Sequence, residues 1–171
     1  HCFPTRRSSD LFYGTTSTGG TNDYGTVFKI TPSGTLTTLH SFDASEGVYP
    51  EAGLVQGSDG NFYGTTFEGG AGCVNCGTVF KITPSGNLTV LYSFQSTDGF
   101  RPEAALVQAS DGNFYGTTTE GGIGNCVDGC GTVFKITPDG TLTFLHRFAG
   151  PDGGDPIAGL IQASDGNFYG T

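Results

Sequence analysis

Four cysteines have the spacing that either a disulfide or a zinc site requires. They lie in pairs in two Gly-rich segments, at positions Cys73, Cys76, Cys126 and Cys130. A third segment of the same kind, residues 17–24, contains no cysteine. A bond between segments would leave cysteines without partners beside a segment that lacks them, so the pattern favours one disulfide inside each segment. A zinc ion held by four thiolates is the alternative and requires the two segments to converge. Free thiols and bonds between the segments are the remaining options.

Aspartates recur in a pattern that could bind a cation. Asp59, Asp111 and Asp165 each belong to the sequence Ser-Asp-Gly-Asn. Oxygen ligands suit calcium, but the spacing of an EF-hand loop is absent. Asp-Gly-Asn is also typical of tight turns, because Asp accepts hydrogen bonds from the nearby backbone and Gly tolerates a positive φ. We therefore expect a structural role for these aspartates and no metal.

Four glutamates could supply the paired carboxylates of a glycosidase. Glu68 and Glu120 occupy equivalent positions of a repeated sequence, and so do Glu51 and Glu103. Catalysis normally uses one asymmetric constellation, whereas copies of a structural unit place equivalent acids apart from one another. The third copy also has Ile157 where the first two have Glu51 and Glu103. We therefore expect no catalytic residue among them.

An aromatic or imidazole ring recurs at one further position. It is His40, Tyr92 and His146 in successive copies. Because Tyr replaces His there, we expect a half-buried ring that makes a hydrogen bond rather than a ligand or a general base.

One N-glycosylation sequon is present, Asn87-Leu88-Thr89. It falls in a predicted turn between strands, where an acceptor asparagine would be accessible, and Asn87 is therefore a candidate for modification.

Composition and charge exclude several classes of protein. Seven basic residues against sixteen acidic ones give a formal net charge of −9, which opposes binding to nucleic acid. No apolar run reaches the ~20 residues of a membrane-spanning helix. The glycines serve turns and lack the following helix of a phosphate-binding loop, so no cofactor is expected. Thirty glycines among 171 residues, with Phe and Tyr plentiful, indicate short strands joined by tight turns.

Internal repetition is the main feature of the sequence. FYGTT begins at Phe12, Phe62 and Phe114, and FYGT at Phe168, while GTVFKITP follows at a variable distance in each complete copy. We assign repeats to residues 12–61, 62–113 and 114–167, with a fourth beginning at 168–171. All variation in length falls in three variable segments, residues 17–24, 67–76 and 119–130.

Residues 1–11 share nothing with the repeats. They resemble the translation of a sequencing adapter, and we predict that they are not native. The chain also stops inside a repeat, and we expect the natural protein to continue on both sides.

Each repeat has the pattern of four short strands. In the second repeat we predict them at residues 61–67, 78–83, 88–94 and 104–109, because apolar and aromatic residues alternate there with polar ones between Pro/Gly and Asp-Gly turns. Four antiparallel strands in about fifty residues fit one blade of a β-propeller. The sequence therefore predicts an all-β fold, a β-propeller fragment with about three four-stranded blades in an open arc.

The repeated motifs resemble a known family. The combination of GTVFKITP, SDGNFYGTT and EGG is similar to the bacterial GloVer (Gloeo-Verruco) tandem repeat, over residues 12–171. The resemblance implies a secreted or surface-displayed bacterial protein, often with an anchor or sorting signal, and no established enzymatic activity. The pattern is also similar to blades of NHL-type propellers.

These observations favour a noncatalytic extracellular repeat protein, a scaffold or an adhesion module. Its contacts would be made through the variable segments, with polysaccharide or surface proteins as partners, or with further copies of itself. Phe67 could stack on a sugar, although Ser17 and Thr119 replace it in the other copies. The alternative is a propeller enzyme acting on polysaccharide, a lyase or a glycosidase, with its catalytic residues outside this sequence.

Overall fold

The strands form because short runs of aromatic and β-branched residues alternate with tight turns. The structure is a computed structural model that describes residues 11–122 and 126–171, so the predicted foreign segment 1–11 lies almost wholly outside the described residues. All the regular elements in these residues are β-strands. The same residues contain no helix that is long and apolar enough to cross a membrane.

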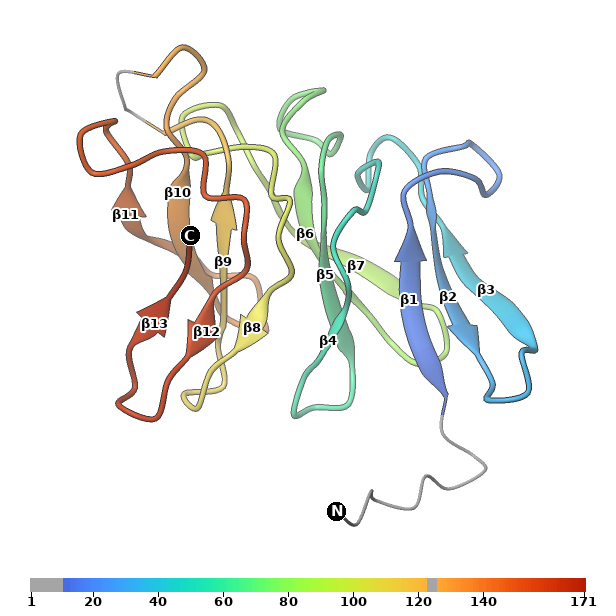
Figure 1. Cartoon of the computed structure of the whole chain (residues 1–171). Helices are drawn as coiled ribbons and strands as arrows, with labels where there is room; N and C mark the ends of the chain where they lie inside the picture. Colours follow the sequence, from blue (N-terminus) through green and yellow to red (C-terminus); the bar gives the residue numbers. More distant parts are fainter. Residues whose placement is uncertain (1–10, 123–125) are drawn as a thin grey trace.

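The strands assemble into four antiparallel sheets that follow one another side by side in chain order (Figure 1). Sheet 1 contains β1 (Phe12–Thr16), β2 (Thr26–Ile30) and β3 (Leu36–Ser41). Sheet 2 contains β4 (Val55–Gln56), β5 (Phe62–Thr66), β6 (Thr78–Ile82) and β7 (Leu88–Ser93). Sheet 3 contains β8 (Val107–Gln108), β9 (Phe114–Thr118), β10 (Thr132–Ile136) and β11 (Leu142–Arg147). Sheet 4 contains β12 (Ile161–Gln162) and β13 (Phe168–Tyr169).

The last strand of each repeat pairs differently from the prediction. The segment predicted at 104–109 is reduced to β8, and β8 pairs with β9 of the next repeat, with Val107 opposite Tyr115. The reason is the length of the connections. The turn between β8 and β9 is a short hairpin closed by the hydrogen bond from Ala109 N to Asn113 O at 2.9 Å, whereas a long connection separates β7 from β8. A complete sheet therefore contains one strand of a repeat and three strands of the following one.

Aromatic side chains join each sheet to the next. In the FY pair of each repeat, the tyrosine stacks on the phenylalanine of the following sheet. The centroid distances are 4.0 Å for Tyr13–Phe62, 3.9 Å for Tyr63–Phe114 and 4.1 Å for Tyr115–Phe168. A second contact is edge-to-face, at 5.2 Å for Phe42–Phe80 and 5.3 Å for Phe94–Phe134. The largest fully buried side chains are six rings of these contacts, so the hydrophobic core lies between sheets; they are Phe42, Tyr63, Phe80, Phe94, Phe114 and Phe134.

Candidate functional site

The variable segments lie together at one end of the sheets. They connect β1 to β2, β5 to β6 and β9 to β10, and all three connections are at the upper end in Figure 1. The long connections that follow β3, β7 and β11 reach the same end. We call this end the loop face. The short hairpins lie at the opposite end, so that length can change on the loop face without disturbing strand register.

Both cysteine pairs on the loop face are joined within their own segments. Cys73 is bonded to Cys76 and Cys126 to Cys130, each with 5.2 Å between the Cα atoms. The second cysteine of each pair is fully buried. The four sulfurs therefore do not converge on a zinc site, and the described residues contain no cluster of three or more side chains suited to a metal ion.

Peptide mapping without reduction is expected to find the Cys73–Cys76 and Cys126–Cys130 linkages. Each bond closes a very short loop, so the chain-entropy model gives only about 2 kcal/mol of stabilisation per bond. We therefore expect reduction to loosen the segments without unfolding the sheets. A Cys76–Cys126 linkage would contradict this pairing.

Arg101 joins two neighbouring variable segments on the loop face. Its Nη1 donates to Glu120 at 2.7 Å and its Nη2 to Glu68 at 3.3 Å. The expectation that equivalent glutamates lie apart was therefore wrong for this pair, because adjacent sheets bring the two segments together. Both carboxylates bind one guanidinium, which fastens the segment of sheet 2 to that of sheet 3.

Phe67, the residue suggested for sugar stacking, is covered by the same side chain. The Arg101 guanidinium lies over the Phe67 ring, 5.2 Å from its centroid, and 5.9 Å from that of Phe100. The face of Phe67 is thus already occupied, and we do not assign it a ligand.

The other glutamate pair shows electrostatic coupling. Burial raises the pKa of Glu103, and the nearby negative charge of Glu51 raises it further, while a hydrogen bond from Thr119 Oγ1 at 3.4 Å opposes the shift. Glu51 and Glu103 lie in the successive long connections that follow β3 and β7, and among the described residues neither forms an ion pair with Arg101.

The aspartates of the Ser-Asp-Gly-Asn turns use their oxygens within the turn. In the second turn, Asp111 accepts hydrogen bonds from the backbone and side-chain nitrogens of Asn113 at 3.0 and 2.8 Å. It also accepts one from the Tyr115 hydroxyl at 2.8 Å. The turns of Asp59 and Asp165 repeat this arrangement with Tyr63 and Tyr169. Asp59 and Asp111 thereby connect their hairpins to tyrosines of the aromatic contacts between sheets.

This turn gives the protein an acid-sensitive contribution to stability. The side-chain hydrogen bond from Asn113 holds the pKa of Asp111 below its usual value. A depressed folded-state pKa stabilises the fold above the unfolded-state pKa, and that contribution is lost as pH falls through the folded-state value. We expect the urea midpoint to drop between about pH 4 and pH 2, and to drop less in Asp111→Asn. Equal acid sensitivity of the two proteins would contradict this assignment.

Each of the recurring rings makes the predicted hydrogen bond, to an acid six residues further along the chain, and His40 and Tyr92 are half-buried as predicted, whereas His146 is exposed. His40 pairs with Glu46 at 2.7 Å, and Tyr92 donates to Asp98 at 2.6 Å. His146 pairs in the same way with Asp152 at 2.8 Å. Burial, and then the Asp98 carboxylate, raise the pKa of Tyr92 to about 12. Each of these hydrogen bonds joins a ring on β3, β7 or β11 to an acid in the long connection that follows that strand.

Asn87 is exposed in the hairpin between β6 and β7, at the end opposite the loop face. Its backbone N–H donates a hydrogen bond to Thr83 Oγ1 at 3.1 Å. Glycosylation of Asn87 stays a prediction.

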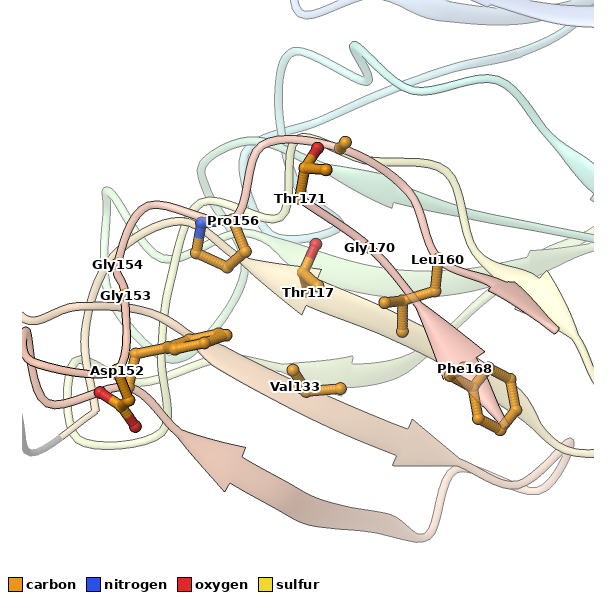
Figure 2. A pocket seen from close by; sticks show the side chains of 12 residues that line it. Thr117, Val133, Asp152, Gly153, Gly154, Pro156, Leu160, Phe168, Gly170 and Thr171 are labelled. Atoms are coloured by element: carbon orange, nitrogen blue, oxygen red, sulfur yellow. The ribbon is translucent and has the colours of Figure 1, made fainter. Parts of the chain in front are cut away.

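A hollow of about 380 Å³ lies beside sheet 4, around Val133, Leu160 and Phe168 (Figure 2). The equivalent residues one repeat earlier are Val79, Leu106 and Phe114, which are buried together between sheets 2 and 3. The hollow is therefore an unfilled position for core side chains between sheets, and we do not assign it to a ligand.

Antiparallel sheets that pack face to face in chain order, with loops gathered at one end, are the blades of a β-propeller. The predicted fold class is confirmed. The chain belongs to the Gloeobacter/Verrucomicrobia repeat family, whose profile matches residues 3–171. This match confirms the resemblance found in the repeated motifs. It begins inside residues 1–11, and the foreign origin of that segment stays a prediction. No curated protein matches the chain in sequence.

Solved structures share the fold. One is assigned as a gluconolactonase, with a TM-score of 0.52 and 16% identity over 85% of this chain and 49% of that one. Another is the extracellular domain of a hybrid two-component system from Bacteroides thetaiotaomicron, with a TM-score of 0.52 and 19% identity over 85% of this chain and 18% of that one. The chain thus spans about half of the first neighbour and less than a fifth of the second.

Proposed function

We propose that the chain is a noncatalytic extracellular repeat module that binds polysaccharide or another surface protein through its loop face. The observation that carries this proposal is the concentration of sequence variation. The three variable segments differ in length and composition at one end of a frame whose strands are nearly identical. Loops held on a rigid scaffold are common binding sites, because they can diversify without loss of the core.

Two further observations support an extracellular location. Each cysteine-containing segment carries a disulfide, which persists in oxidising compartments. One structural neighbour is an extracellular domain, although the likeness concerns the fold alone.

The test is a loop exchange that the chain itself provides. Residues 67–76 are replaced by the sequence of residues 17–24, which occupies the same place in sheet 1 and needs no disulfide. Binding to immobilised polysaccharides and to bacterial cell-envelope proteins is measured before and after the exchange. We expect at least a tenfold loss of binding. The matched control is Asn87→Thr, which copies Thr35 and Thr141 of the other hairpins at the opposite end, and should change nothing. Equal binding by all three proteins would refute the proposal.

Self-association is a second part of the proposal, and the exposed tyrosine of sheet 4 supports it. Tyr169 is 52% exposed in a shallow hollow that it lines with Ala158 and Ile161, whereas its equivalents Tyr63 and Tyr115 are buried against the next sheet. A second copy could cover this face of sheet 4 by aromatic contacts of the same kind. Sedimentation velocity should then show larger species as concentration rises, and a monomer at every concentration would remove this part.

The alternative function is a polysaccharide lyase or glycosidase with its catalytic residues in other parts of a longer protein. The solved structure assigned as a gluconolactonase supports only the fold of such an enzyme. Release of reducing ends or unsaturated sugars by the longer protein would favour the enzyme.

A further inference from the structure

A groove crosses the loop face where sheet 1 meets sheet 2. It has a volume of about 460 Å³ and is formed by three connections. The first variable segment contributes Tyr24, the connection after β3 contributes Ser45 and Tyr49, and the second variable segment contributes Glu68 and Val74. The groove therefore combines two aromatic rings, a hydroxyl, a carboxylate and an apolar rim.

The two tyrosines differ from the structural tyrosines of this protein. Four others donate their hydroxyls to aspartates, namely Tyr63, Tyr92, Tyr115 and Tyr169. In the described part of the chain, the hydroxyls of Tyr24 and Tyr49 make no hydrogen bond to protein. Their rings meet edge to face with centroids 6.5 Å apart. They thus place two half-buried rings and two free hydroxyls at one groove.

The three repeats have the same backbone conformation at the positions of Tyr24 and Tyr49 but different side chains there. The residue equivalent to Tyr49 always has a left-handed φ, between 52° and 58°, and its N–H donates to the carbonyl of the residue equivalent to Tyr24 at 3.0–3.2 Å. The equivalents are Arg101 with Cys76 and Asp155 with Cys130. The aromatic pair therefore does not arise from the needs of the repeat, because the same backbone accepts a cation or an acid.

The charges near the groove select the kind of ligand. Glu68 accepts a hydrogen bond from Arg101 through Oε1, and within residues 11–122 and 126–171 its Oε2 has no hydrogen-bond partner. With a chain charge of −9, this carboxylate disfavours sulfated or uronic-acid polymers. Neutral sugars have apolar C–H faces that pack on tyrosine rings and hydroxyls that donate to a carboxylate.

We propose that this groove binds a neutral sugar residue of a polysaccharide, with Tyr24 and Tyr49 as the contact surface and Glu68 as the hydrogen-bond acceptor. The proposal rests on the proposed function and assigns one site and one ligand class to the loop face.

The experiment measures retardation of the full chain in native gels that contain hydroxyethyl cellulose or galactomannan, with alginate as the anionic probe. We expect retardation by at least one neutral polymer and none by alginate. Tyr49→Asn removes the ring and retains a residue that accepts a positive φ, and should weaken binding at least tenfold. Tyr24→Phe keeps the ring and loses the hydroxyl, and should weaken it by about threefold, in line with the loss of one modest hydrogen bond.

The matched control is Asp155→Asn, the same substitution product at the equivalent position of the third repeat, which should bind like the parent chain. Circular dichroism and the urea midpoint establish that each variant is folded. Neutral-polymer binding that survives Tyr49→Asn but not the loop exchange would overturn the groove assignment and leave the proposed function intact. Retardation by alginate alone, or capture of a protein without any polysaccharide, would also overturn this inference. The absence of binding to every polysaccharide and envelope protein would refute both.

Discussion

Phe94→Ala is expected to lower the free energy of unfolding by about 3–5 kcal/mol, the range for removal of a fully buried aromatic ring. Phe94 is 0% exposed and follows β7, where its ring meets Phe134 of sheet 3 edge to face with centroids 5.3 Å apart. It belongs to a cluster that contains the side chains of both sheets. Its loss leaves a cavity at the interface on which the order of the sheets depends.

The third repeat provides a matched control for this substitution. Phe148 is the equivalent residue, but it lies at the hollow beside sheet 4 and is only partly buried. Phe148→Ala should therefore lose less than half as much as Phe94→Ala. Urea unfolding measures the loss of stability in both variants. Hydrogen exchange of the β6 and β10 amides is measured as well, because tandem repeats can open one unit at a time. Equal losses at the two positions would show that the interface between sheets contributes little.

Gly77→Ala is expected to reduce stability by about 3 kcal/mol or more, and the melting temperature by roughly 6–12 °C. Gly77 precedes β6 and has a φ of 82°. A Cβ atom would lie 2.3 Å from the carbonyl oxygen of Thr66 and 2.9 Å from that of Phe67. Both obstacles are backbone atoms of the paired strand and its connection, so relief requires the hairpin to open.

Gly60 separates the two causes of this loss. Its φ is 81°, nearly the same as that of Gly77, but a Cβ atom there meets nothing within 4 Å. Gly60→Ala should therefore cost only the left-handed backbone, about 1 kcal/mol, or roughly 3 °C. If thermal unfolding gave the same shift for both alanines, steric overlap with the strand would not be the source of the larger effect.

The repeats allowed the fold class to be predicted because nearly identical strands and turns recur, with the variation in length confined to one connection of each repeat. The phase of the sheets was missed, since β8 consists of only Val107 and Gln108, which are too few residues for a pattern that favours pairing with the strand before or with the strand after. Pairing with β9 is decided by the length of the connections on either side. Sequence spacing in the hairpin Ala109–Asn113 contained this information, because a turn of that length brings its two flanking strands together.

The loop face was predictable from variation in length, but the residues of the groove were not. Tyr24 stands at the end of a variable segment, at the position of the buried cysteines, and its role emerges only when Tyr49 is brought beside it. The signal available in the sequence was a tyrosine replacing Cys76 and Cys130 in the one repeat without a disulfide. Phe67 was a more obvious aromatic, yet the Arg101 side chain covers it. Contacts across neighbouring sheets cannot be derived from one repeat alone.

The offset between repeats and sheets also bears on how such an array can grow in a genome. Each repeat donates three strands to one sheet and a fourth to the next. Unequal recombination between two copies at any matching position therefore adds or removes a whole repeat. The strands at the new junction still pair, because each neighbouring repeat supplies the same strands. A gene of this design can change its number of copies in one step without passing through an unpaired intermediate.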